Sequence, residues 1–251
     1  MYAFQVCGYS KSGKTTLIKE LIGRLSKEGF QVASIKDIHH KGFQMDKEGT
    51  DTTLHNRAGA DPVVARGLKE TDYLYNHKMD FLEIMAKLSS DWLVVEGYNE
   101  FPLPKIVCGK TESDMDDFLD NRTFAIAGVY SKTRTTYRGF RVFNPLDPVD
   151  MNDLMTLIKA KVFRCLPYVD DSFCGLCGLT CSRMVEAIVQ GEKAYSDCKT
   201  RNTSVHLKIG GEDIPLKGFV QNILRNTLTG MVSELRGWVR GRRIEIVLDE
   251  E

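Results

Sequence analysis

Apolar and polar positions follow two different periods in the first third of the chain. Residues 3–7 form a short apolar-rich run that predicts a β-strand ending at Gly8. The apolar positions that next repeat at helical spacing are Leu17, Ile18, Leu21, Ile22 and Leu25. Gly29 then stands where a helix C-terminal glycine belongs, and residues 31–35 predict a second strand. Strand, helix and strand in this order predict a βαβ unit with parallel strands.

Shorter segments of the same two kinds continue to about residue 165. The polar stretch 37–59, with three histidines, predicts a long loop that enters a helix near Thr52. The further strands we expect cover residues 62–65, 92–96, 105–108 and 124–129, and the further helices cover 80–88 and 151–162. The acidic stretch "ESDMDDFLD" is expected to be a solvated loop or a helix.

The composition changes near residue 166, where glycine-spaced cysteines begin. We therefore expect two domains, 1–165 and 166–251. The elements expected in the second domain are a helix after the cysteines, a strand over 205–209, a turn at 210–211, a helix over 219–236 and a closing strand over 244–248. The predicted fold class is α/β: a mostly parallel sheet with flanking helices, plus a small α+β cysteine-rich domain.

Residues 8–15 read "GYSKSGKT", which is the Gly-x4-Gly-Lys-Thr pattern of a phosphate-binding loop. This pattern occurs by chance, but here it lies between a predicted strand and an amphipathic helix. Glycines let backbone N–H groups turn towards phosphate oxygens, and the helix N-terminus adds the positive end of its dipole. Lys14 is expected to reach the outer phosphates, and Thr15 is expected to ligate Mg²⁺. The mostly parallel sheet is therefore predicted to be P-loop NTPase-like.

A carboxylate is expected at the end of the strand "WLVVE". Glu96 lies where P-loop proteins place the residue that serves Mg²⁺ or water, so Lys14 and Glu96 are the candidate catalytic residues. Asp37 is either a second carboxylate near the phosphates or a turn-initiating aspartate. No Asn-Lys-x-Asp motif for guanine occurs, so motifs alone leave GTP and ATP open. No arginine finger or water-positioning glutamine is evident, which favours slow hydrolysis.

The run from Gly8 to Asp61, followed by "WLVVEGY", resembles the MobB family of molybdopterin-guanine dinucleotide biosynthesis, over roughly the first 165 residues. Its most distinctive positions are Lys36, His39, His40, Asp46, Gly49, Asp51 and residues 58–60. The resemblance implies a GTP-binding, usually homodimeric protein with weak GTPase activity. It implies an adaptor beside a MobA-like nucleotidyltransferase, which joins GMP to molybdopterin. The nucleotide-binding residues implied are Gly8, Ser12, Gly13, Lys14, Thr15, Thr16, Asp46 and Asp51, with Thr15 and Glu96 at the metal.

Four of the seven cysteines have the spacing C-x2-C-x3-C-x16-C. They are Cys174, Cys177, Cys181 and Cys198. Four thiolates are the ligand set of a [4Fe–4S] cluster or of a structural Zn²⁺. Three clustered cysteines and one distant cysteine are more typical of iron–sulfur, so we expect a [4Fe–4S] cluster, with Zn²⁺ as the alternative. The block also resembles the small iron–sulfur domain of corrinoid iron–sulfur and Rnf-type proteins, with one residue missing before the third cysteine.

Charge and hydropathy exclude several classes of partner. Thirty-four basic and 34 acidic residues give a net charge of zero, so no global attraction to nucleic acid or to an anionic membrane is expected. Apolar runs fall far short of the roughly 20 residues of a membrane span, and no secretory signal is evident, so we expect a cytoplasmic protein. The leading hypothesis is a GTP-binding adaptor of molybdenum or tungsten cofactor biosynthesis with a fused [4Fe–4S] module. The alternative is a P-loop kinase or an ATP-dependent ligase acting on a small-molecule acceptor.

Overall fold

The computed structural model describes residues 1–40, 42–97, 101–167, 177–199, 205, 207–209, 212–214, 216, 218–239 and 244–247. The chain divides into two compact units, Met1–Cys165 and Leu166–Glu251. Within these described ranges, no helix combines the length and the apolar character that crossing a bilayer requires.

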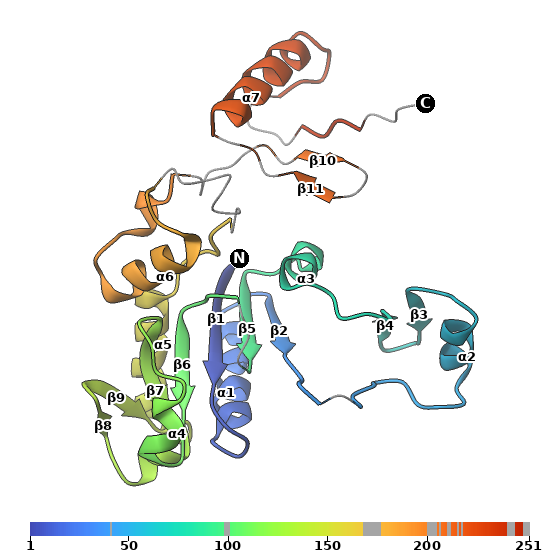
Figure 1. The fold of residues 1–251 in the computed structure, drawn as a ribbon. Helices are drawn as coiled ribbons and strands as arrows, with labels where there is room; N and C mark the ends of the chain where they lie inside the picture. The colour runs from blue at the N-terminus through green and yellow to red at the C-terminus, as the bar shows by residue number, and fades with distance from the viewer. Residues whose placement is uncertain are drawn as a thin grey trace. The chain divides into compact units, whose positions relative to one another are not determined.

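A sheet with the strand order β2-β5-β1-β6-β7-β9-β8 forms the centre of the first unit (Figure 1). Its strands are β1 (Tyr2–Cys7), β2 (Val32–Lys36), β5 (Trp92–Glu96), β6 (Lys105–Cys108), β7 (Thr123–Ala127), β8 (Thr136–Tyr137) and β9 (Phe140–Phe143). All neighbouring pairs run parallel except β8, which is antiparallel to β9. The predicted mostly parallel α/β sheet is therefore confirmed. A separate antiparallel hairpin is formed by β3 (Val63–Arg66) and β4 (Thr71–Leu74).

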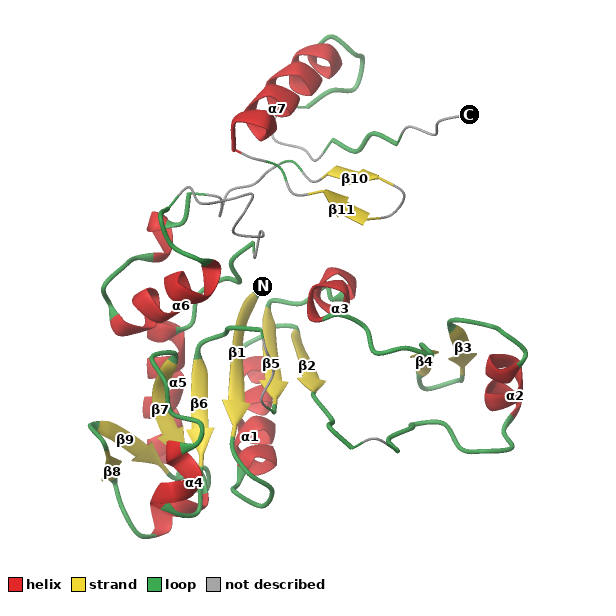
Figure 2. Cartoon of the chain, in the orientation of Figure 1, coloured by secondary structure: helices red, strands yellow, loops and turns green. Residues whose placement is uncertain are grey.

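Helices flank this sheet (Figure 2): α1 (Lys14–Lys27), α3 (Phe81–Lys87), α4 (Glu112–Asp116) and α5 (Pro148–Lys161). The helix α2 (Asp51–Arg57) instead lies beside β3 of the hairpin. A 3-10 turn, η1, covers Val129–Lys132. The helices α1 and α5 lie side by side, because Lys159 Nζ of α5 is 2.6 Å from Glu28 Oε2 just after α1. Met115 of α4 packs in a cluster with β6, β7 and β9, and Phe81 and Met85 of α3 pack against β5.

The predicted amphipathic helix is confirmed as α1, and its apolar stripe faces the core. Four of its five stripe residues are buried: Leu17, Ile18, Leu21 and Leu25. Every residue of β1 after Tyr2 is buried, because β1 is a central strand paired along both edges, and both faces of a central parallel strand are covered by packed elements. The strands β1 and β2 are parallel, as predicted, but β5 lies between them and pairs with both.

The end of β7 differs from the sequence-based prediction. A strand was expected over 124–129, but β7 ends at Ala127 and the 3-10 turn η1 begins at Val129. Gly128 has φ +98°, a left-handed conformation that interrupts an extended strand. The strands β4, β8 and β9 were not predicted. The hairpin of β8 and β9 turns through Arg138 and Gly139, both with positive φ, which matches a two-residue hairpin turn.

The second unit contains short elements. They are α6 (Cys181–Gln190), a 3-10 turn η2 (Tyr195–Asp197), β10 (Leu207–Ile209), β11 (Glu212–Ile214) and α7 (Gly218–Ser233). The Thr180 hydroxyl caps α6 by accepting the Arg183 N–H at 3.1 Å, and Gly191 with φ +81° ends the helix. The strand predicted over 244–248 is wrong for residues 244–247, which lie in no regular element. Leu248 and the predicted turn at 210–211 lie outside the described residues.

Candidate functional site

The phosphate-loop sequence lies at the carboxyl end of β1, between this strand and α1. The sheet order changes direction at β1, with β5 on one side and β6 on the other. In open parallel sheets, ligands bind outside the carboxyl ends of the strands at such a switch point. The turn after β7 contacts the loop directly, because the Val129 N–H donates to the Ser12 carbonyl at 3.0 Å.

Two positions of this loop require glycine, because each has a positive φ and neighbouring backbone atoms leave little or no room for a side chain. Gly8 has φ +140°, and a Cβ atom there would lie 2.0 Å from the Cys108 carbonyl oxygen. Gly13 has φ +100° and caps α1; its Cβ would lie 3.0 Å from Gly128 Cα. L-residues with a side chain rarely adopt these φ values. The loop therefore packs closely on the turns after β6 and β7, and its backbone has the curved path that an anion cradle needs.

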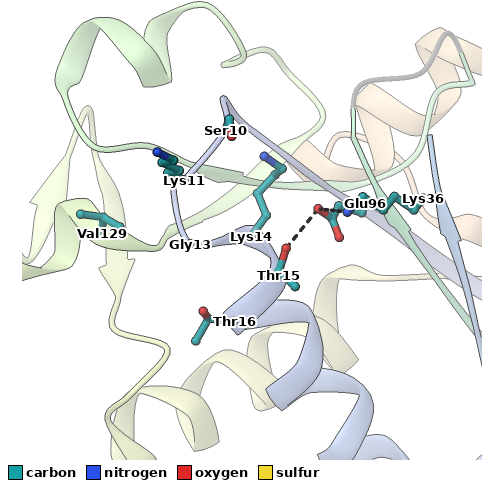
Figure 3. A pocket seen from close by; sticks show the side chains of 9 residues that line it. All are labelled: Ser10, Lys11, Gly13, Lys14, Thr15, Thr16, Lys36, Glu96 and Val129. Carbon is teal, nitrogen blue, oxygen red and sulfur yellow. Dashed lines mark hydrogen bonds and ion pairs between the residues drawn. The ribbon is translucent and has the colours of Figure 1, made fainter. Parts of the chain in front are cut away.

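An open pocket of about 390 Å³ lies over this loop (Figure 3). The residues that line it are Ser10, Lys11, Gly13, Lys14, Thr15, Thr16, Lys36, Glu96 and Val129. Three lysines and one carboxylate make the lining net positive, which suits a polyanionic ligand. The predicted residues Gly13, Lys14, Thr15, Thr16 and Glu96 thus line one pocket, whereas the predicted residues Gly8 and Ser12 of the same loop do not line it.

Thr15, Glu96 and Lys36 form a line across the pocket from three different elements (Figure 3). The Thr15 hydroxyl donates to Glu96 Oε1 at 3.2 Å, and the same oxygen lies 3.7 Å from Lys36 Nζ. The Lys14 ammonium donates to the carbonyls of Gly8 and Tyr9 at 2.7 and 2.8 Å. A hydroxyl beside a carboxylate is a donor set that Mg²⁺ accepts, and a lysine over the loop suits phosphate. The residues present therefore fit a magnesium nucleotide.

Asp46 and Asp51 do not line this pocket. The hydroxyls of Thr52 and Thr50 hold the pKa of the Asp46 carboxyl below its usual range, and Thr53 also donates to it at 3.0 Å. Asp51 is the first residue of α2. The implied role of both residues at the nucleotide stays a prediction. Asp37, the other carboxylate considered, also lies outside the lining, with Oδ2 3.5 Å from His39 Nε2.

The sequence did not single out Lys11, Lys36 or Val129 for this pocket. Lys11 occupies one of the four positions that the loop pattern leaves unspecified, and its φ of +63° adds a left-handed residue to the loop. Lys36 is the last residue of β2 and Val129 the first of η1, so each reaches the pocket through sheet order. The one feature of the sequence that could have placed a residue of this group at the pocket was the position of Lys36 at a strand end, next to Asp37.

Six of the seven cysteines fall into two groups, and Cys165, at the end of the first unit, belongs to neither. Cys7 and Cys108 are the last residues of β1 and β6 and are fully buried, and burial raises the pKa of their thiols to about 11 and about 12. Within the described part of the second unit, Cys177, Cys181 and Cys198 do not come together as a metal-ligating group, and Cys174 lies outside the described residues. The four-thiolate site therefore stays a prediction.

Comparisons with known proteins agree on one family. Residues 3–131 match the family described as molybdopterin guanine dinucleotide synthesis protein B, MobB. A putative molybdopterin-guanine dinucleotide biosynthesis adapter protein of Methanocaldococcus jannaschii is 30% identical, over 99% of this chain and 98% of that protein. A probable adapter protein of the same name from Bacillus subtilis is 29% identical, over 62% of this chain and 93% of that protein.

A solved structure supports the same assignment. The crystal structure of Bacillus subtilis MobB is similar with a TM-score of 0.54 and 27% identity, over 62% of this chain and 98% of that one. The match to the Methanocaldococcus protein extends over nearly the whole chain and so includes both units. The phosphate loop, its pocket and these matches lead to one conclusion: the chain belongs to the MobB family.

Proposed function

We propose that this protein is a GTP-binding adapter of molybdopterin-guanine dinucleotide biosynthesis, which assists the attachment of GMP to molybdopterin beside a MobA-like nucleotidyltransferase. The names of its relatives support the adapter role. The observation that supports nucleotide binding most directly is the pocket over the glycine-rich loop, which is lined by three lysines and by the hydrogen-bonded pair of Thr15 and Glu96.

The loop and three of the side chains that line the pocket have distinct roles in this proposal. Backbone N–H groups of residues 8–13 and the N-terminus of α1 bind phosphate oxygens, and Lys14 binds the outer phosphates. Thr15 and Glu96 hold Mg²⁺, which supplies charge neutralisation at the phosphates when bound. Neither arginine nor glutamine is among the residues that line the pocket, which supports slow rather than fast hydrolysis.

Calorimetric titration of the full chain with GTP and ATP, each with Mg²⁺, tests the nucleotide. We expect GTP to bind more tightly, with turnover far slower than that of a metabolic kinase. A preference for ATP, with turnover that rises when a small-molecule acceptor is added, would instead establish the kinase or ligase alternative. We also propose that the protein is a homodimer, as the resemblance to MobB implies, and light scattering of the same sample tests this.

The adapter role needs a separate test with the partner present. The chain, with and without GTP, would be titrated into a MobA-like nucleotidyltransferase, and formation of the dinucleotide cofactor from GTP and molybdopterin would be followed. We expect binding and a faster conversion. Absence of both effects would contradict the adapter role even if GTP binds.

We propose further that the cysteines of the second unit bind a metal centre, a [4Fe–4S] cluster with Zn²⁺ as the alternative. Their spacing and soft thiolate chemistry support this proposal. After anaerobic purification, we expect about four iron and four sulfide per chain for the cluster, or about one zinc for the alternative. Cys177→Ser should lose the metal, whereas Cys165→Ser, outside the motif, should keep it. A metal-free wild type would contradict the proposal.

A further inference from the structure

Lys36 has a position in the pocket that the loop motif does not explain. It is the last residue of β2 and pairs in register with Glu96, the last residue of β5. Register partners on parallel strands direct their side chains to the same side of the sheet. Both side chains accordingly line the pocket, with Lys36 Nζ 3.7 Å from Glu96 Oε1 (Figure 3).

Stability alone does not account for this ion pair. The Lys36 side chain is 62% exposed, and exposed pairs contribute little to folding. The separation of 3.7 Å is also longer than a charge-assisted hydrogen bond, which is about 2.7–2.9 Å. The Lys36 ammonium is therefore held loosely and can turn towards an anion in the pocket at small cost.

The neighbours of Lys36 indicate which part of a nucleotide it would meet. Thr15 and Glu96 mark the side where the metal and the outer phosphates bind in a P-loop site. Lys36 lies beyond Glu96 on that side, and Val129 lies at the opposite end of the loop (Figure 3). Lys36 thus faces the terminal phosphate end of the pocket, away from Val129.

We propose that Lys36 is the residue that distinguishes nucleoside triphosphate from nucleoside diphosphate by binding the terminal phosphate. This inference rests on the proposed nucleotide-binding function. Lys14, the loop lysine, binds oxygens of the outer phosphates. A terminal phosphate adds further negative charge at that end of the pocket. A second cation there lowers the free energy of the triphosphate complex and leaves the diphosphate complex nearly unchanged.

The test compares Lys36→Ala with Lys19→Ala, which removes the same charge from an exposed position of α1 outside the pocket. Dissociation constants for GTP and GDP would be measured with Mg²⁺ by calorimetry. We expect Lys36→Ala to raise the dissociation constant for GTP about tenfold and that for GDP less than about twofold. Lys36→Arg should restore most of the GTP affinity, and Lys19→Ala should change neither constant. Urea unfolding of each variant confirms that the fold is retained.

The outcomes separate this inference from the function on which it rests. Equal losses for GTP and GDP in Lys36→Ala, or no loss for either, would overturn the role of Lys36 while leaving nucleotide binding intact. Failure of the wild-type protein to bind either nucleotide would overturn the proposed function and this inference together.

Discussion

Replacing Lys14 with alanine is expected to weaken GTP binding by about 100-fold, the upper part of the range for hydrogen bonds to a charged partner. Lys14 is the lysine of the Gly-Lys-Thr sequence, and its ammonium lies over the loop at the carbonyls of Gly8 and Tyr9. The substitution removes a positive charge that lies against the loop backbone, where we expect the phosphates to bind. Calorimetry with GTP and Mg²⁺ measures the effect.

The matched control for Lys14→Ala is again Lys19→Ala, further along the same helix and outside the pocket. The control should bind GTP as the wild type does. Circular dichroism should show both variants folded, because Lys14 is not part of the apolar stripe of α1. An unchanged affinity in a folded Lys14→Ala variant would contradict the assignment of this loop as the phosphate site.

Replacing Gly128 with alanine is expected to lower the free energy of unfolding by about 3 kcal/mol or more. Gly128 has φ +98° and ψ −151°, a region that is accessible essentially to glycine alone. A Cβ atom there would lie 2.3 Å from the Ser12 carbonyl oxygen, which is backbone and cannot move aside without moving the loop. Urea denaturation of the variant and the wild type measures the loss.

Gly139→Ala is the control for Gly128→Ala. Gly139 also has positive φ, +82°, but a Cβ atom there would meet nothing within 4 Å. Gly139→Ala should lower the free energy of unfolding only by the conformational strain, about 1–2 kcal/mol. GTP affinity should fall in Gly128→Ala and stay unchanged in Gly139→Ala, because Gly128 adjoins the bond between Val129 and Ser12. Equal losses of stability would show that the loop does not rest on Gly128.

Strong local periodicity made the centre of the fold predictable. The strand β1, the helix α1 and the strand β5 were expected at nearly their observed limits, because buried strands read as apolar runs and α1 carries an apolar stripe. The strands β8 and β9 were missed, since they are two and four residues long and carry little pattern. The strand expected over 244–248 had the right pattern, but apolar alternation alone does not create a pairing partner.

Some residues of the candidate site were likewise predicted from local sequence, and others were not. Lys14 and Thr15 were predicted because the Gly-x4-Gly-Lys-Thr motif is local and by itself fixes their positions in a phosphate-binding loop. Glu96 was predicted from its place at a strand end, and the structure brings it to 3.2 Å from Thr15. Lys36 was not assigned to the pocket, because its approach to Glu96 depends on which strand pairs with β5.

By itself, the sequence determined the local features of this protein: the glycine-rich loop, the helix that follows it, the buried strands and the resemblance to MobB. These features depend on neighbours within a few residues, where steric and hydrophobic preferences act directly. Only the tertiary structure decided that β5 lies between β1 and β2, which places Lys36 beside Glu96. It also decided that Gly128 packs against Ser12 of the loop, 116 positions earlier in the chain. Such contacts arise from strand order and close packing between distant segments, which no local pattern encodes.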